Sequence, residues 1–260
     1  MPRAGSVRSL ERGLEVLTVI NQHNGIKPGD IARIANIPRP TVYRLIETLE
    51  EHNFVTRDHT AGKWRATLKT KTLSSGYRNE DWVQRHAVPR MMQLGRDILW
   101  PLDLVMFNDH QMEIRESTHH YSPYSIDHGM VGQSLPILST ASGRAYLAFS
   151  PPAERDRTLA SLRIAQDLDE AIVLEDGPLE LILERSRQLG LGFRMQGFRS
   201  ATMSLSAPIL QDARVVGCLT LIWTSSALKF DRALALYGYV LTQTAQDISA
   251  VINPDGEGAR

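Results

Sequence analysis

Cysteine, long apolar runs and net charge are what this sequence has least of. Only one of its 260 residues is a cysteine, Cys218, which excludes a framework of intrachain disulfides and is typical of the reducing cytoplasm. No apolar run approaches the length of a membrane span, and the first residues lack the apolar core of a signal peptide. These absences predict a cytoplasmic protein with no membrane contact.

The formal net charge of zero hides an uneven distribution along the chain. Residues 1–78 carry 13 Lys and Arg against 7 Asp and Glu, whereas residues 79–260 carry 16 against 22. With 42% hydrophobic residues, the chain is long enough for a small basic domain and a second domain with its own core. A basic module beside an acidic remainder is typical of proteins that hold nucleic acid at one end.

Residues 27–50 are the most informative segment, because they predict two short helices joined by a tight turn. The second helix has a polar face at Thr41, Arg44 and Glu47. Its apolar stripe consists of Val42, Leu45, Ile46 and Leu49. This pattern predicts a helix-turn-helix, and the alternative is an ordinary helical hairpin inside a core.

The second of these helices has the chemistry to enter the major groove of DNA. Arginine bonds bidentately to guanine edges, while threonine and tyrosine reach phosphates or thymine methyl groups. The candidate DNA-contacting residues on this helix are Arg39, Thr41, Tyr43 and Arg44. We therefore expect double-stranded DNA as a partner.

A further helix is predicted over residues 9–22, before the helix-turn-helix. Ser9 is its candidate N-cap, and Asn24 and Gly25 end it. Its predicted buried stripe consists of Leu10, Leu14, Val16, Leu17 and Ile20. The three helices together would form one small core.

A hairpin predicted after the helix-turn-helix would form the wing of a winged helix. Two β-prone runs within residues 54–67 flank a turn centred on residues 58–62. The basic residues of this hairpin that we expect to touch phosphates are Arg57, Lys63 and Arg65.

Residues 68–100 connect this module to the rest of the chain. Within them, residues 79–99 predict an amphipathic helix with Asn79 or Asp81 as its cap, which Pro89 must kink or restart. Its apolar residues are Trp82, Val83, Ala87, Met91, Leu94 and Ile98. We interpret this helix as a dimerisation element, and the alternative is that it covers the sheet of the second domain.

Strands and helices alternate through the rest of the chain, which predicts an α+β fold with an antiparallel sheet flanked by helices. The predicted strands are residues 102–108, 111–117, 124–128, 192–196, 203–210 and 214–223. The predicted helices are residues 141–149, 153–162, 178–189 and 230–252. Alternation within residues 203–209 places Ser204 and Ser206 opposite a row of apolar residues, where they could line a polar pocket. The polar residues 254–260 are expected to form a mobile tail.

Three segments resemble the IclR family of bacterial transcription regulators. They are residues 7–17 (VRSLERGLEVL), 38–49 (PRPTVYRLIETL) and 135–149 (LPILSTASGRAYLAF). The resemblance covers nearly the whole chain. It implies a winged helix-turn-helix in residues 1–67, a linker helix in residues 68–100 and a GAF-like effector-binding domain in residues 101–253. It also implies a small organic acid as effector, and homodimers or homotetramers on palindromic operator DNA.

Shorter motifs narrow the resemblance. Residues 100–101 (WP), 115–119 (RESTH) and 130–132 (MVG) further resemble the family's activators of 3-hydroxyphenylpropionate catabolism, which implies an aromatic carboxylate as effector. Many family members carry acidic residues in the loop before the strand that corresponds to residues 203–210, whereas residues 192–200 (GFRMQGFRS) carry none. This departure favours an anionic effector held by Arg194 or Arg199, and the alternative is that both arginines lie in solvent.

A carboxylate effector requires a cationic or amide-rich end and an apolar wall. Arg115, in the middle of a predicted strand, is the preferred anchor, and the alternative is that it faces solvent or is paired. Ser139, Thr140 and Ser142 lie where backbone amides at the start of a helix favour an anion, unless one of them only caps that helix. The remaining candidates for the effector site are Tyr124, Met130, Arg199, Ser204, Ser206 and Cys218. We predict that Cys218 is a small buried residue that fills space in the core and is not a nucleophile.

A zinc-binding protein and an enzyme are the two other classes of function to compare with the sequence. A zinc site would draw on His119, His120, His128 and Cys218, but adjacent histidines on a strand point to opposite faces and no metal-binding spacing occurs. An enzyme could use a hydroxyl nucleophile from residues 140–143 (TASG), but the sequence has no nucleophile elbow, Walker motif or glycine-rich dinucleotide loop. A ligand-independent DNA-binding repressor would not need so large a second domain. We therefore expect a cofactor-free, ligand-responsive regulator of a catabolic operon that is not an enzyme.

Overall fold

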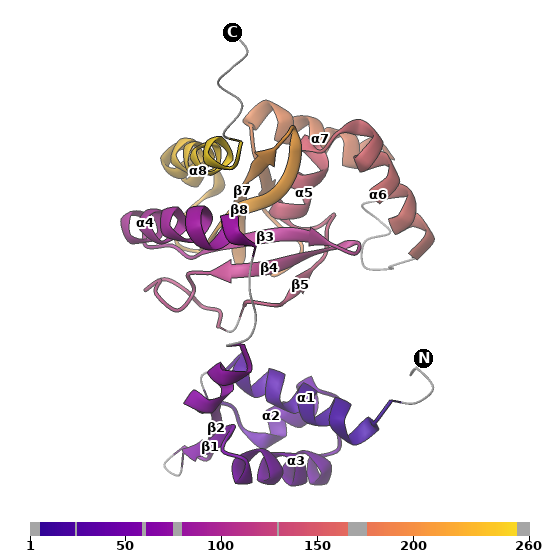
Figure 1. The fold of residues 1–260 in the computed structure, drawn as a ribbon, viewed down its shortest axis with the longest axis vertical. Helices are drawn as coiled ribbons and strands as arrows, with labels where there is room; N and C mark the ends of the chain where they lie inside the picture. The colour runs from indigo at the N-terminus through magenta and orange to yellow at the C-terminus, as the bar shows by residue number, and fades with distance from the viewer. Residues whose placement is uncertain are drawn as a thin grey trace. The chain divides into compact units, whose positions relative to one another are not determined.

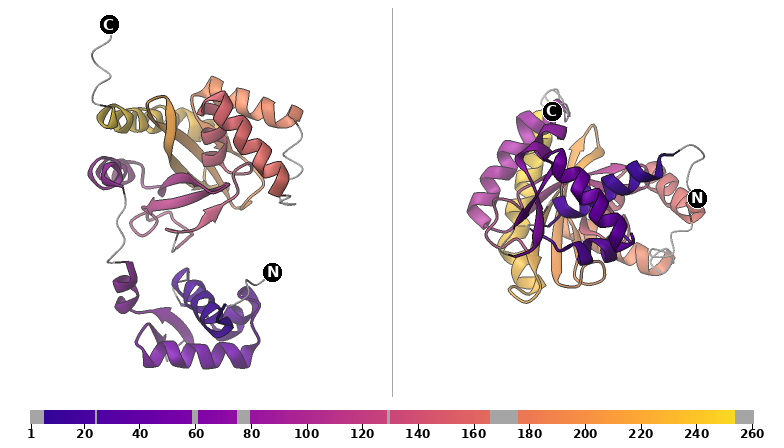
Figure 2. Two further views of the ribbon diagram at one scale, coloured as in Figure 1. Left: turned by 45° about the vertical axis from the view of Figure 1, so that its right-hand side comes forward. Right: turned by 90° about the horizontal axis from the view of Figure 1, so that it is seen from below.

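The computed structural model describes residues 6–23, 25–58, 61–74, 80–128, 130–165 and 176–253, and Figures 1 and 2 show the fold. The chain divides into two compact units, one of residues 1–78 with 127–129 and one of residues 79–126 with 130–260. Each unit has hydrophobic clusters of its own. The predicted tail of residues 254–260 and the candidate cap Asn79 lie outside the described residues.

The first unit consists of helices followed by a hairpin. These elements are α1 (Arg8–Asn21), α2 (Pro28–Ile34), α3 (Arg39–Glu51), β1 (Val55–Asp58) and β2 (Lys63–Ala66). The helices enclose a core in which Ile31, Val42 and Ile46 are fully buried. Trp64 of β2 exchanges two backbone hydrogen bonds of 2.8 and 2.9 Å with Ile26, which fasten the hairpin to the helices. The predicted helix-turn-helix and wing are therefore confirmed.

Two predictions for α1 are wrong. The helix begins one residue earlier than predicted, so Ser9 lies inside its first turn and caps nothing. Leu10 and Leu14, predicted to be buried, are 60% and 57% exposed. The side of α1 that faces α3 passes through Gly13 instead, where an added Cβ would lie 3.9 Å from Leu45. The buried stripe is thus rotated away from the two leucines, which remain on the surface of the unit.

The second unit is built on a six-stranded antiparallel sheet in the order β5-β4-β3-β8-β7-β6. Its strands are β3 (Leu102–Asn108), β4 (Gln111–Ser117), β5 (Ser134–Leu135), β6 (Gly192–Arg194), β7 (Thr202–Gln211) and β8 (Arg214–Thr224). The strand predicted at residues 124–128 does not form. The chain turns here instead, since the backbone N–H groups of Tyr121 and Ser122 both bond to Thr118 and Pro123 has no N–H to give.

Helices cover both faces of this sheet (Figure 1). On one face lie α5 (Ala141–Phe149) and α7 (Asp176–Leu189), with α6 (Pro152–Ala165) following α5, and on the other lie α4 (Val88–Ile98) and α8 (Phe230–Ile252). The alternation predicted in β7 is present: Leu205, Ala207 and Ile209 join the cluster under α4 and α8. Ser204 and Ser206 are buried on the opposite face, toward α5. The predicted α+β architecture is therefore confirmed.

The segment before α4 explains how the helix tolerates its proline. The connection begins with a 3-10 helix, η1 (Leu68–Ser74), and a π-helical turn, η2 (Val83–Ala87), runs directly into α4. Pro89 lies in the first turn of α4, which begins directly after this wider turn. The α-helix therefore restarts at the proline, as predicted, while the chain stays helical across the junction. Asp81 is already helical and pairs with Arg85 at 2.8 Å, and so it is not the cap.

The apolar face of this helical segment is occupied within the second unit. Val83, Ala87, Met91 and Leu94 are at most 4% exposed and pack in the cluster beneath α8. The sheet and α8 already cover these apolar residues, while the prediction that the helix is a dimerisation element stays a prediction. The alternative, that the helix covers the sheet of the second domain, is what the structure shows.

Two glycines let α5 approach its neighbours more closely than any side chain permits. A Cβ at Gly143 would lie 1.8 Å from the carbonyl oxygen of Ile137, and one at Gly192 would lie 2.2 Å from that of Ala141. Real Cβ atoms do not come so close to backbone, and only glycine fits both positions. The start of α5 is therefore held against β6 and the chain before it.

Gly143→Ala should lower the free energy of unfolding of the protein by about 1–3 kcal/mol, because the added methyl group overpacks a rigid backbone contact. Chemical denaturation measures this directly. Gly95→Ala is the matched control in α4, since a Cβ there meets only Thr118 and Leu102 side-chain atoms at 3.7–3.8 Å. Equal stability of the two variants would contradict the close seating of α5.

Candidate DNA interface and effector site

The exposed side of α3 carries the residues predicted to read DNA. Arg39, Tyr43 and Arg44 are exposed and Thr41 is half-buried, while the opposite side of the helix is buried in the core. Tyr43 keeps 51% of its surface exposed. The guanidinium of Arg44 has no hydrogen-bond partner among the residues that the structure describes. This side of α3 is therefore available to a nucleic acid.

Two further basic residues lie near the start of α3, and one of them, Arg33, is paired with Asp30 at 3.4 Å. The guanidinium of Arg39 lies against α2, with its Nη2 atom 3.2 Å from where a Cβ of Gly29 would be. Arg39 and Tyr43 border a hollow of about 700 Å³ together with Lys27 and Arg33. We did not predict these last two residues, because their proximity to Arg39 depends on how α2 and α3 cross.

The three basic residues predicted in the wing differ in how much charge they offer. Arg57 and Lys63 are exposed on the hairpin, on either side of its turn. Arg65 instead pairs with Asp58 across the strands, at 2.5 Å. An ion pair largely cancels the charge that Arg65 would present to a phosphate. Lys63 and Arg57 are consequently the stronger phosphate candidates.

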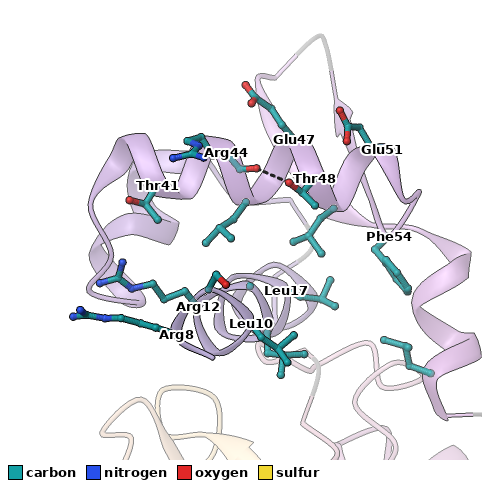
Figure 3. Close-up of a pocket in the computed structure, with 16 residues that line it drawn as sticks. Arg8, Leu10, Arg12, Leu17, Thr41, Arg44, Glu47, Thr48, Glu51 and Phe54 are labelled. Atoms are coloured by element: carbon teal, nitrogen blue, oxygen red, sulfur yellow. Dashed lines mark hydrogen bonds between the residues drawn. The ribbon is translucent and has the colours of Figure 1, made fainter. Parts of the chain in front are cut away.

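An apolar groove lies between α1 and α3 (Figure 3). Its volume is about 920 Å³, and its lining includes the exposed Leu10 and Leu14 and the more buried Leu17. Figure 3 shows Arg8 and Arg12 on the same side of the groove as Thr41 and Arg44, away from Phe54. Leu10 and Leu14 thus leave an exposed apolar surface beside this groove.

In the second unit, several predicted effector residues meet between α5 and the sheet. Ser142, Ser206 and Cys218 are at most 1% exposed. The thiol of Cys218 donates to the carbonyl oxygen of Ser142 at 3.5 Å, and the hydroxyls of Ser206 and Thr220 are 2.8 Å apart. Ser204 lies two residues before Ser206 on the same face and is 3% exposed. We call this group, Ser142, Ser204, Ser206 and Cys218, the α5 polar cluster.

Thr140 and Cys218 have structural roles that the sequence left open. Thr140 is the N-cap of α5: its Oγ1 accepts from the amide of Gly143 at 3.3 Å and donates to Pro136 at 2.7 Å. Ser139 is half-buried just before it. Burial raises the pKa of the Cys218 thiol from 9.0 to about 12, against a smaller lowering by the Ser206 hydroxyl. A thiol with this pKa is protonated at neutral pH, so Cys218 is a buried filler as predicted and not a nucleophile.

The three arginines considered as anchors have different surroundings. Arg115 pairs with Glu113 at 3.3 Å, which matches the alternative that it is an ion-pair partner. Arg194 is 4% exposed, and its guanidinium donates to the carbonyl groups of residues 198, 199 and 202, so it shapes the loop before β7. Arg199 donates to Gln133 at 3.2 Å and lies 3.8 Å from the sulfur of Met130. The structure thus brings Arg199 and Met130 together.

Tyr124 contacts a different part of the second unit from Arg199 and Met130. Its ring packs on Trp100, with centroids 4.8 Å apart, and it keeps 51% of its surface exposed. The two rings border a shallow hollow of about 650 Å³ that Ile126 and Tyr237 also line. Because Trp100 belongs to the cluster under α4 and α8, Tyr124 is not placed with Met130, which packs on the α5 side.

Two protein-family models match this chain. Residues 9–59 match the IclR helix-turn-helix domain, and residues 82–250 match the bacterial transcriptional regulator IclR C-terminal domain. The chain belongs to the IclR family. It is a DNA-binding transcription regulator with a C-terminal effector domain, and not an enzyme.

Individual relatives are distant but similar over their whole length. The HTH-type transcriptional repressor AllR of Escherichia coli K12 is 25% identical over 254 residues, which cover 94% of this chain and 90% of AllR. The crystal structure of the Thermotoga maritima IclR matches 94% of this chain and 98% of that one, with a TM-score of 0.62 and 18% identity. The crystal structure of an IclR homolog from Microbacterium hydrocarbonoxydans in complex with 4-hydroxybenzoate matches 94% of this chain and 98% of that one, with a TM-score of 0.58 and 18% identity. These relatives do not support the narrower resemblance to the phenylpropionate activators.

Neither a membrane-spanning helix nor a cluster of metal ligands occurs in the part of the chain that the structure describes. No helix in the described part of the chain is long and apolar enough to cross a membrane. Among those same residues, no three His, Cys, Asp or Glu side chains come together as metal ligands would.

Lys63→Ala should weaken binding to operator and random duplexes alike, because a wing lysine contacts only phosphates. The slope of log affinity against log salt should fall by about one unit per bound wing. Fluorescence anisotropy at several salt concentrations measures both quantities. Arg65→Ala is the matched control, since its charge is already paired with Asp58, and it should change the slope less. A slope that Lys63→Ala leaves unaltered would place the wing off the DNA.

Proposed function

We propose that this regulator senses a small aromatic carboxylic acid in its second unit and controls a catabolic operon through its winged helix. The observation that carries the proposal is the α5 polar cluster, a group of buried hydroxyls and one thiol set among apolar residues at the start of a helix. Effector sites are mostly apolar and hold a few polar groups that fix the orientation of the ligand. The ligand seen in the Microbacterium homolog, 4-hydroxybenzoate, belongs to the same chemical class.

The surroundings of this cluster favour an aromatic acid. Phe107 stacks on Tyr146 with ring centroids 4.4 Å apart, and both pack on the α5 side of the sheet near Met130. Arg199, beside Met130, supplies a cation with which a carboxylate would form a charge-assisted hydrogen bond. We therefore propose Arg199 as the anchor, because it lies beside Met130 on the α5 side of the sheet.

Binding of the effector would act on DNA by shifting the population of conformations. A ligand that prefers one arrangement of the second unit changes the spacing or orientation of the two recognition helices relative to successive major grooves. A dimer is required for this, since a palindromic operator has two half-sites one helical turn apart. We propose that two copies pair through the surface around Leu10 and Leu14 of α1, which the fold leaves exposed beside the groove.

Arg199→Gln should weaken binding of 4-hydroxybenzoate by about 1.5–3 kcal/mol, because it removes a hydrogen bond to a charged group. Isothermal titration calorimetry measures the loss, and operator affinity without the acid should stay the same. Arg115→Gln is the matched control and should bind the acid as the wild type does. If the control loses affinity and Arg199→Gln does not, the anchor is Arg115. A panel of benzoates, cinnamates and phenylpropionates that produces no thermal shift would contradict the proposed effector class.

Leu10→Glu combined with Leu14→Glu should convert the protein to a lower oligomeric state, because two carboxylates on the proposed contact repel those of the partner copy. Light scattering after size exclusion measures the mass, and operator affinity should fall with it. Leu181→Glu, at a position in α7 that is 74% exposed, controls for the added charge. An unchanged mass in the double variant would rule out α1 as the contact between copies.

A further inference from the structure

A buried carboxylate and a buried imidazole face each other in the second unit, at ion-pair distance but without a hydrogen bond between them. Asp103 of β3 and His119, two residues after β4, are each 3% exposed. The Oδ1 atom of Asp103 and the Nε2 atom of His119 are 3.6 Å apart, which is too far for a hydrogen bond. Neither atom has a hydrogen-bond partner among the described residues. Such buried, unmet polar atoms cost about 1–3 kcal/mol each, so a pair of them calls for an explanation.

The imidazole is held where it is by its other contacts. Its Nδ1 atom lies 2.6 Å from the hydroxyl of Ser125, and the backbone amide of His119 bonds to Ser117 at 3.3 Å. The backbone N–H of Leu102 donates a hydrogen bond of 2.8 Å to the hydroxyl of the preceding residue, Thr118, and this bond links the turn to β3. When the Ser125 hydroxyl donates to Nδ1, the neutral ring carries its proton on Nε2. The pair then presents an N–H donor and a carboxylate acceptor side by side.

The register of the sheet places this pair beside the α5 polar cluster. Asp103 lies opposite Thr220, and Thr220 lies opposite Ser206, so their side chains share one face of the sheet. Cys218 is two residues from Thr220 on the same strand and contacts Ser142 of α5.

The chemistry of the pair selects one kind of ligand group. A second carboxylate would be repelled by Asp103, and an ammonium group would pair with Asp103 but offer no acceptor to the N–H of His119. A hydroxyl group does both: it donates to Oδ1 and accepts from Nε2–H. Its oxygen can lie about 2.8 Å from each atom, because the two are 3.6 Å apart.

We propose that Asp103 and His119 together recognise a hydroxyl group of the effector. This inference rests on the proposed function, and it narrows the effector to hydroxylated aromatic acids. A site with buried polar groups rejects an analogue without the hydroxyl, because the analogue leaves those groups unpaired. Asp103 and His119 are thus specificity residues, distinct from the anchor of the carboxylate.

Calorimetry with two matched pairs of acids tests the inference. The pairs are 4-hydroxybenzoate with benzoate, and 3-(3-hydroxyphenyl)propionate with 3-phenylpropionate. In the wild type, the hydroxylated member of at least one pair should bind ten times tighter or more. In Asp103→Asn and in His119→Gln this ratio should fall toward one, whereas Glu113→Gln, which alters a carboxylate on the neighbouring strand, should preserve it.

The outcomes separate the two proposals. Equal affinities within both pairs in the wild type, which requires no variant to fold, would overturn the hydroxyl assignment and leave an aromatic acid as the effector. A ratio that survives in Asp103→Asn and His119→Gln would also overturn it, provided that both variants melt cooperatively. If none of the four acids binds, the proposed effector class fails and the hydroxyl assignment fails with it.

Discussion

The close seating of α5 on its neighbours is the contact on which the effector domain depends. Gly143 and Gly192 bring the helix to within backbone distance of Ile137 and of β6, so the start of α5 lies directly over the buried hydroxyls of β7. A larger residue at either position would separate the helix from the sheet and open the α5 polar cluster. The stability of this unit and the shape of its proposed site are therefore set by the same contact.

The first unit depends on a different balance, between a small core and a basic surface. Its helices bury enough apolar area to hold α3 in place, while Leu10 and Leu14 remain exposed on α1. The arginines of α3 and the lysine of the wing supply the charge that long-range attraction to DNA requires. The same unit thus has one surface for the operator and a second, apolar surface, through which we propose that two copies pair.

Patterns within single elements were predicted well, and contacts between distant elements were not. The bounds of α5 and α8 agree with the sequence. The long helix α8 has clear apolar periodicity, and α5 begins at a capping threonine, Thr140. The exposure of Leu10 was missed because it depends on how α1 is rotated against α3. Asp103 was overlooked and His119 was considered only as a metal ligand, although a carboxylate inside an apolar strand signals a buried partner. Their pairing follows from sheet register, which one sequence alone does not reveal.

The central claim is that one chain couples an effector site to operator binding, and coupling of this kind is reciprocal. The most direct test is to measure by calorimetry the affinity of the protein for 4-hydroxybenzoate, with and without saturating operator DNA. The account predicts that operator changes this affinity, in the same direction and by the same factor as the acid changes operator affinity. An acid that binds with one affinity in both conditions would contradict it.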